Sequence, residues 1–225
     1  MPSVLLCGIT NADVTIHFTS SILRMQTEMM RTPGVSVSFE FFRTVNDALT
    51  HFHKNTRDDV CVVIDGQLSV ETGFVLQHDL SKPFVVASYP LRTVDWDRVR
   101  AKLTDSEESA SHVGIKYNYD PALTTPEPGG TYVKIPPDAE VQLKIFKITR
   151  EVLGSIIERH APEVLGQDGD VVVYSDGIID GQRVSPDQRF VRLWGNPIYA
   201  NVSEKTKNVG PYDFTGAVGN QRQLR

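Results

Sequence analysis

One acidic side chain stands where many α/β enzymes place a functional carboxylate. The run VCVVIDGQLSV, Val60–Val70, is apolar and rich in β-branched residues until Asp65, which is followed by a glycine and by Gln67. Such a run predicts a buried strand that ends at Asp65. Open α/β sheets bind their ligands beyond the carboxyl ends of the strands. A carboxylate there can hydrogen-bond a hydroxyl group or hold a cation, although a strand-end aspartate is also a common turn residue.

A second strand end supplies further candidates for the same crevice. The apolar run Ser3–Ile9 predicts a first buried strand, and Ile9, Thr10 and Asn11 stand at its end. The carboxyl ends of neighbouring parallel strands meet at one edge of a sheet. We therefore expect these three residues to flank one crevice together with Asp65.

The sequence motifs of several other enzyme classes are absent. The sequence contains no P-loop, no G-x-G-x-x-G and no G-x-S-x-G nucleophile elbow. His51 and His53 are two positions apart on an expected helix, so their side chains point in different directions and do not share a metal. The Asp-Gly steps at 168–170 and 176–181 lack the spacing of a calcium loop and indicate turns.

The first 65 residues alternate between strand and helix. Apolar residues at helical spacing predict a helix over 13–31, with Asn11 or Asp13 as its cap, and Thr44 begins a second helix. Alternating apolar residues predict a strand over 35–42 between these helices. The order β-α-β-α-β predicts an α/β fold with a mostly parallel sheet flanked by helices.

The remaining chain is less regular and rich in loops. Polar or proline-rich loops are expected over 104–111 and 121–130. Further helices are expected over 70–78, after Thr93 and from Ser185, which caps the last of them. Further strands are expected over 83–89, 171–174 and 196–200, with a hairpin near 176–181. One more strand is expected to turn helical near Thr149. No repeat or linker divides the chain, so we expect a single domain over 1–225.

Composition excludes several classes of protein. The net charge is −5 and no basic stripe is present, which argues against a nucleic-acid partner. No apolar run is long enough for a membrane span, and the N-terminus is a poor signal peptide. Cys7 and Cys61 fall in apolar runs and are expected to be buried free thiols. These features predict a cytoplasmic protein.

Six stretches of sequence, taken in order, resemble a known family. They are DVTIHFTSSILRMQTEMM from Asp13, VVIDGQ ending at Gln67, VVASYPLRTVDWDRV from Val85, IFKITREVL from Ile145, SPDQRFVRLWGNPIYA from Ser185 and NVGPYDFTG from Asn208. The chain resembles the small GT-A-fold glycosyltransferases of microbes and large DNA viruses. The resemblance covers nearly the whole chain, and the stretch around Tyr89 and Trp96 is its most specific part.

The resemblance implies a GT-A-like (Rossmann-like) fold and a nucleotide-sugar donor, with a carbohydrate or glycoprotein as acceptor. It divides the chain into a nucleotide-sugar-binding half, 1–100, and an acceptor-side half with a tail, 101–225. In the family, the two acids of a D-x-D motif hold Mn²⁺ or Mg²⁺. For a viral member of the family, the location is the host cytoplasm or the virion.

This chain departs from the family at the expected metal ligands. Asp65 matches the first acid, but Gln67 replaces the second and Asn208 replaces a late histidine. Asp65 and Asn208 remain as metal-ligand candidates, and an amide brings no charge to a cation. Pro186 replaces the glutamate of an S-E-D motif, whereas Asp187 is retained. We therefore expect metal dependence to be weak or lost.

The site residues implied by the resemblance form two groups. Asp187 is the candidate catalytic base or acceptor contact, although an acid in the first turn of a helix also has a purely structural explanation. The candidates for donor binding are Ile9, Thr10, Asn11, Asp65, Gln67, Tyr89 and Arg92.

Three functions fit these residues. An active glycosyltransferase is preferred, since neutral replacements occur in metal-independent transferases. A catalytically inactive relative with a sugar-binding or structural role, for example as a virion component, is the alternative that Gln67, Pro186 and Asn208 favour. An unrelated nucleotide-binding α/β module would leave the stretch from Tyr89 to Trp96 unexplained.

Overall fold

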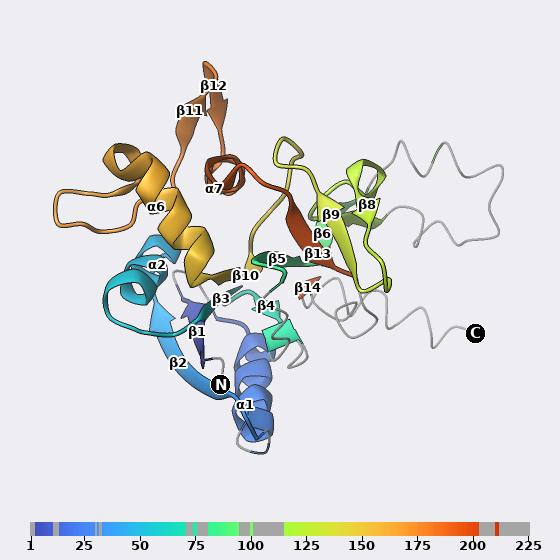
Figure 1. Ribbon diagram of the computed structural model, residues 1–225. Coiled ribbons are helices and arrows are strands. Elements are labelled where there is room, and N and C mark those ends of the chain that lie inside the picture. The colour runs from blue at the N-terminus through green and yellow to red at the C-terminus, as the bar shows by residue number, and fades with distance from the viewer. Residues whose placement is uncertain are drawn as a thin grey trace.

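The computed structural model describes residues 3–10, 14–29, 31, 33–70, 74–75, 81–94, 100, 115–202 and 210–211. Its centre is an eight-stranded sheet in the order β2-β1-β3-β10-β5-β13-β9-β8 (Figure 1). The strands of this sheet are β1 Ser3–Ile9, β2 Ser36–Phe42, β3 Val60–Asp65, β5 Phe84–Ala87, β8 Thr125–Pro126, β9 Tyr132–Ile135, β10 Ile145–Thr149 and β13 Ile198–Asn201.

Most strands of this sheet run in one direction. β1 is parallel to both β2 and β3, and β13 is parallel to β5. β10 lies between β3 and β5 and is antiparallel to both. β9 is antiparallel to its neighbours β13 and β8. The fold is therefore α/β with a large, mostly parallel sheet, as the alternation of elements predicts.

Shorter elements surround the sheet. The helices are α1 Ile16–Met29, α2 Val45–Lys54, α6 Arg150–Val164, α7 Pro186–Trp194 and the 3-10 turn η1 Pro121–Leu123. Three small strand pairs join β4 Leu68–Ser69 to β14 Gly210–Pro211, β6 Pro90–Val94 to β7 Ile115–Tyr117, and β11 Gly177–Ile179 to β12 Gln182–Val184. Within the described residues, each helix is too short or too polar to cross a lipid bilayer.

Local sequence signals explain where the helices begin. Thr44 caps α2 in a capping box with Asp47, in which each side chain accepts a hydrogen bond from the other residue's backbone N–H. Ser185 caps α7 and Pro186 takes its first position. The Thr15 hydroxyl accepts from the backbone N–H of Phe18 at the start of α1, whereas the expected caps Asn11 and Asp13 lie outside the described residues.

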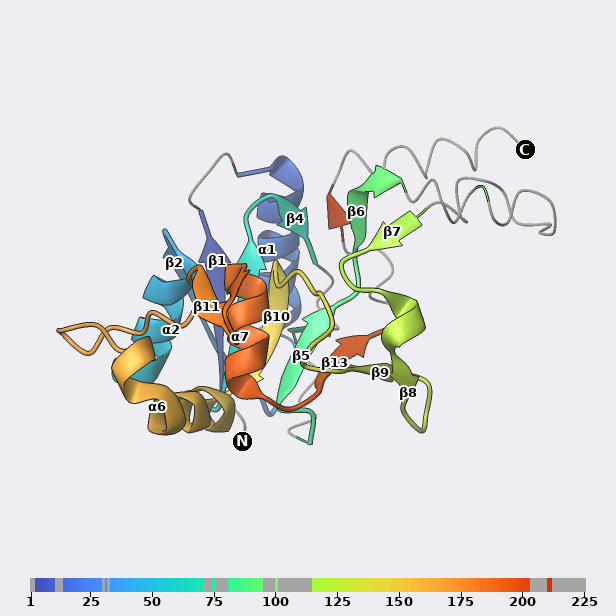
Figure 2. The same cartoon turned by 90° about the horizontal axis from the view of Figure 1, so that it is seen from above.

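Alternating strand residues face two separate apolar layers. On one face, α2, α6 and α7 cover the sheet and pack against residues such as Cys7 and Phe146. On the other face, α1 packs against residues such as Leu6 and Val62. Figure 2 shows α1 on the opposite side of the sheet from α2, α6 and α7. Cys7 and Cys61 are both buried and free, as expected, with their Sγ atoms 3.7 Å apart.

Several expected elements differ from the structure. The expected strand over 171–174 is wrong, because this segment makes only one isolated bridge, between Val171 and Leu165. Thr93 lies within β6 instead of capping a helix, and most of the helices expected over 70–78 and after Thr93 lie outside the described residues. The proline-rich stretch over 121–130 contains η1 and β8.

Candidate functional site

The direction of β10 brings a distant segment to the end of β3. Ile9 and Asp65 are paired at the carboxyl ends of β1 and β3. Because β10 is antiparallel to β3, it begins at the edge of the sheet where β3 ends. The backbone N–H of Asp65 donates to the Lys144 carbonyl over 2.8 Å. Residues 142–144, which lead into β10, therefore lie beside the strand ends that the sequence singles out.

A tight turn fixes the Asp65 carboxylate. Asp65 Oδ1 accepts from the backbone N–H of Gln67 over 2.9 Å. The backbone N–H of Gly66 donates to the Ile9 carbonyl over 2.9 Å. A Cβ atom at Gly66 would lie 2.7 Å from that same carbonyl oxygen, so only glycine fits there. The turn thus holds Asp65 against the end of β1.

Lys144 is the nearest cation to Asp65 among the described residues. Its Nζ lies 3.6 Å from Asp65 Oδ2, and the two side chains keep 41% and 27% of their surface exposed. A partly exposed pair at this distance contributes little to stability. Because both side chains are partly exposed, both charged groups remain accessible to a ligand. Lys144 is not among the residues predicted from the sequence, where its one visible signal is a charge directly before an apolar strand.

Tyr89 lies beneath this segment and not on its surface. Its side chain is 1% exposed. The hydroxyl donates to the Gln142 carbonyl over 3.1 Å and accepts from the backbone N–H of Lys144 over 3.3 Å. Burial raises the pKa of the Tyr89 hydroxyl. Tyr89, expected to contact a donor, here positions the 142–144 segment from inside.

Asp187 reaches the same segment from the first turn of α7. Its Oδ1 accepts from the backbone N–H of Leu143 over 3.1 Å and also from the Tyr174 hydroxyl. Burial raises the pKa of the Asp187 carboxyl, while the hydrogen bonds from Tyr174 and Leu143 and the charge of Lys144 oppose this shift. Burial and the charge of Asp187 raise the pKa of Tyr174, so the phenol keeps its proton and remains a donor.

The segment Val172–Tyr174 is held by two other elements. Asn46 in α2 donates its amide to the Tyr174 carbonyl and accepts from the Tyr174 N–H, each over 2.9 Å. Buried Arg189 in α7 donates to the carbonyls of Val172 and Val173 over 2.8 and 3.0 Å. These side-chain bonds replace the ladder that a strand would make, which explains why the expected strand over 171–174 is absent.

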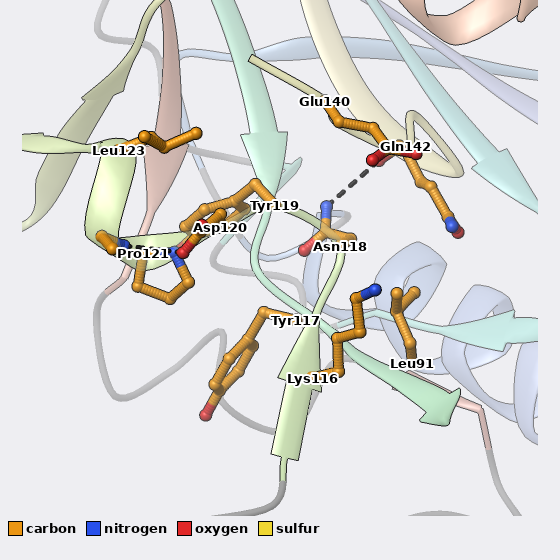
Figure 3. A pocket seen from close by; sticks show the side chains of 11 residues that line it. Leu91, Lys116, Tyr117, Asn118, Tyr119, Asp120, Pro121, Leu123, Glu140 and Gln142 are labelled. Carbon is orange, nitrogen blue, oxygen red and sulfur yellow. Dashed lines mark hydrogen bonds between the residues drawn. The ribbon is translucent and has the colours of Figure 1, made fainter. Parts of the chain in front are cut away.

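Gln142 also lines a pocket. It has a volume of about 690 Å³ and is lined by residues of β7, η1 and the segment before β10 (Figure 3). Asn118, 2% exposed, forms part of its lining. The Asn118 amide donates to the carbonyls of Ala87 and Gln142 and accepts from the Tyr89 N–H, each over 3.1 Å. Asn118 therefore joins the pocket wall to the end of β5 and to Gln142.

Of the remaining predicted residues, the structure describes Ile9, Thr10 and the side chain of Gln67. The Thr10 backbone N–H donates over 2.9 Å to the carbonyl of Phe42, at the end of β2, and Ile9 is 5% exposed. The half-buried side chain of Gln67 follows Asp65 directly. Asn11, Asn208 and the side chain of Arg92 lie outside the described residues.

The described residues do not fit a Mn²⁺ or Mg²⁺ centre. No three histidine, cysteine or acidic side chains gather within the part of the chain that the structure describes. Asp65 already accepts from Gln67 N–H and faces Lys144. Gln67 offers only a neutral amide, whereas these cations favour several oxygen ligands with carboxylate charge.

The chain is only weakly similar to known proteins. No family model and no curated protein matches the sequence. The crystal structure of A197 from STIV matches with a TM-score of 0.39 and 13% identity, over 90% of this chain and 96% of that chain. The nucleoside-diphosphate-sugar pyrophosphorylase from Vibrio cholerae RC9 matches with a TM-score of 0.39 and 9% identity, over 96% of this chain and 80% of that chain. Neither likeness is close enough to assign an activity.

Proposed function

We propose that this protein transfers a sugar from a nucleotide-sugar donor to a carbohydrate or glycoprotein acceptor without requiring a divalent cation. One observation carries the proposal: Asp65 and Asp187, far apart in sequence, both contact the segment Leu143–Lys144. The sequence points to Asp65 by its place after an apolar strand, and the family resemblance points to Asp187. Their convergence supports one site with a donor side and an acceptor side.

On the donor side, Lys144 provides the positive charge that a diphosphate needs. A lysine ammonium contacts phosphate oxygens as a point charge, and this interaction is strongest where the lysine is already held near the ligand. Asp65 is then free to accept a hydrogen bond from a ribose or sugar hydroxyl. In this proposal residues 1–100 supply most of the donor-binding site, and residues 101–225 contribute Lys144 to it.

On the acceptor side, Asp187 acts as general base. Its carboxylate takes the proton of the acceptor hydroxyl while that oxygen forms a bond to the anomeric carbon. The bond between the anomeric carbon and the phosphate oxygen breaks, and the nucleoside diphosphate leaves with the bonding electrons. A carboxylate with a raised pKa is a stronger base than an exposed aspartate, which suits this role.

A second candidate function is sugar-nucleotide binding without transfer. It is favoured by one observation: Asp187 Oδ1 already accepts two hydrogen bonds, from Leu143 and from Tyr174. A carboxylate engaged in this way also serves as a structural link between α7 and the 142–144 segment. The two functions share the donor site and differ in turnover.

Calorimetric titration of the full chain with UDP-glucose and GDP-mannose, with and without Mn²⁺, tests the donor site. We expect binding that Asp65→Asn weakens and that Mn²⁺ does not strengthen. Asp58→Asn is the matched control, because Asp58 precedes β3 at the opposite end of the same strand. Release of nucleoside diphosphate in the presence of saccharide acceptors then separates transfer from binding alone. No binding of either donor by folded protein would refute the proposal.

A further inference from the structure

The pocket beside Gln142 has the size and the lining of a small-ligand site. Its volume of about 690 Å³ falls within the range of ligand-binding clefts. Its wall is held in place, because Asn118 is bonded to three backbone groups and the Tyr119 hydroxyl is hydrogen-bonded to Ser88. Its rim carries more exposed side chains, including Lys116, Asp120 and Glu140.

The lining combines an aromatic surface with planar polar groups. Tyr117 is half-buried, and its ring lies 6.5 Å from that of Tyr119 at an angle of 31°. Figure 3 shows Tyr117, Asp120 and Gln142 around one opening. A pyranose ring presents a face of C–H groups that packs on an aromatic ring, while its hydroxyls bond to amides and carboxylates. This combination of groups suits a saccharide.

The charge of the lining disfavours a phosphate. Asp120 and Glu140 carry two negative charges, against one positive charge on Lys116. Within the described residues, none of these three side chains forms a salt bridge, although Asp120 accepts from the backbone N–H of Ala122 over 2.9 Å. Two carboxylates repel a diphosphate more strongly than a single lysine attracts it. A neutral ligand avoids this repulsion.

Three consecutive residues connect the pocket to the two carboxylates. Gln142 lines the pocket, the N–H of Leu143 donates to Asp187, and the side chain of Lys144 faces Asp65. Tyr89 binds both Gln142 and Lys144, so the three residues are held as one unit. A ligand in this pocket would therefore lie next to the acceptor side of the proposed transfer site.

From this lining, its charge and its position, we propose that the pocket formed by Tyr117, Asp120, Glu140 and Gln142 binds a neutral saccharide, the end of the acceptor on which the transferase acts. This inference rests on the proposed function for its role in catalysis. The binding itself requires no donor, which makes it separately testable.

Saturation-transfer NMR on the full chain without nucleotide tests this inference. The probes are lactose, cellobiose, maltose and N,N′-diacetylchitobiose. We expect at least one to bind, with Kd raised about tenfold in Tyr117→Ala and nearly unchanged in Tyr117→Phe, which keeps the ring. Tyr199→Ala, at a half-buried tyrosine on β13 outside the pocket, is the control for a general effect of losing a tyrosine.

Three results would overturn the saccharide site. The first is that no probe binds; if the donors bind under the same conditions, the proposed function still stands. The second is that a saccharide binds equally to the protein and to Tyr117→Ala, which places the ligand elsewhere. The third is that UDP-glucose displaces the saccharide and loses affinity in Tyr117→Ala, which would mean that a nucleotide-sugar occupies the pocket. Failure of donor binding alone overturns only the proposed function.

Discussion

Asp65 and Asp187 both contact the short segment Leu143–Lys144, yet their surroundings differ. Asp65 is partly exposed and lies 3.6 Å from the ammonium of Lys144. Asp187 is bonded to a tyrosine and a backbone N–H, and among the described residues no cation pairs with it. A partly exposed carboxylate remains open to a ligand from solvent, which suits hydrogen bonding to a hydroxyl group. A carboxylate removed from water gains affinity for a proton, which suits proton transfer.

The largest effect is expected on turnover when the Asp187 carboxylate is replaced. Asp187→Asn keeps an oxygen for Leu143 and Tyr174 but removes the base, so turnover should fall by about 10²- to 10⁴-fold. Donor Kd should stay unchanged. Release of nucleoside diphosphate and calorimetry measure the two quantities, and Asp176→Asn, at an exposed site, is the control. Unchanged turnover would remove Asp187 from the chemistry and leave it as a structural link.

The next largest effect is expected on donor binding when the cation beside Asp65 is removed. Lys144→Met keeps much of the apolar stem but removes the charge, so the Kd for UDP-glucose should rise about 10- to 100-fold. Added salt should weaken donor binding in the native protein more than in the variant. Lys116→Met, in the pocket, is the matched control and should leave donor Kd unchanged. An equal loss in both variants would show that the two sides are not distinct.

A smaller effect is expected on stability as pH changes. The folded protein holds the Asp187 proton more tightly than the unfolded chain, because the pKa is raised above its ordinary value of 3.8. Asp187 therefore favours folding at low pH, and this contribution is lost as pH rises from about that value through the raised pKa. The loss is at most about 1.4 kcal/mol per pH unit.

Urea unfolding across this range checks the sign. The free energy of unfolding of Asp187→Asn, relative to the native protein, should rise with pH. Asp59, whose pKa is lowered by hydrogen bonds from Ser3, gives the opposite slope, but it is present in both proteins and cancels in the difference. A difference that falls with pH would contradict the burial of the Asp187 carboxyl.

The smallest effect is expected from metal. Because Asp65 faces Lys144 and Gln67 brings no charge, Mn²⁺ or EDTA should change donor Kd by less than about twofold. Calorimetry with Lys144→Met under the same conditions sharpens this prediction. A variant that regains donor affinity on addition of Mn²⁺ would indicate that the cation and the lysine are interchangeable. A native protein that needs Mn²⁺ would refute the metal-free donor site.

Much of the sheet could be predicted from sequence because its signals are local. The apolar runs ending at Ile9 and Asp65 identify β1 and β3, and Thr44 with Asp47 identifies the start of α2. Ser185 and the turn at Asp180, which has a φ of 52°, likewise mark the start of α7 and the hairpin before it. Each of these features depends on residues a few positions apart.

The candidate site depends on distant contacts, which a single sequence does not reveal. Nothing near Lys144 indicates that β10 enters the sheet antiparallel between β3 and β5. The β-branched run Val171–Val173 resembles a buried strand, but Asn46 and Arg189 satisfy the backbone groups around it. The pocket wall at Asn118 is likewise formed by contacts with Ala87 and Gln142.

The insertion of β10 also determines when the site comes into existence during synthesis. As the chain emerges, β3 and β5 are present long before the strand that joins them, so this part of the sheet forms only after residue 149 is available. Asp187 arrives later still. A ligand that contacts both Asp65 and Asp187 would therefore bind only the finished sheet. Such a ligand would stabilise the native protein against partly folded and shortened chains, linking the supply of substrate to the yield of folded protein.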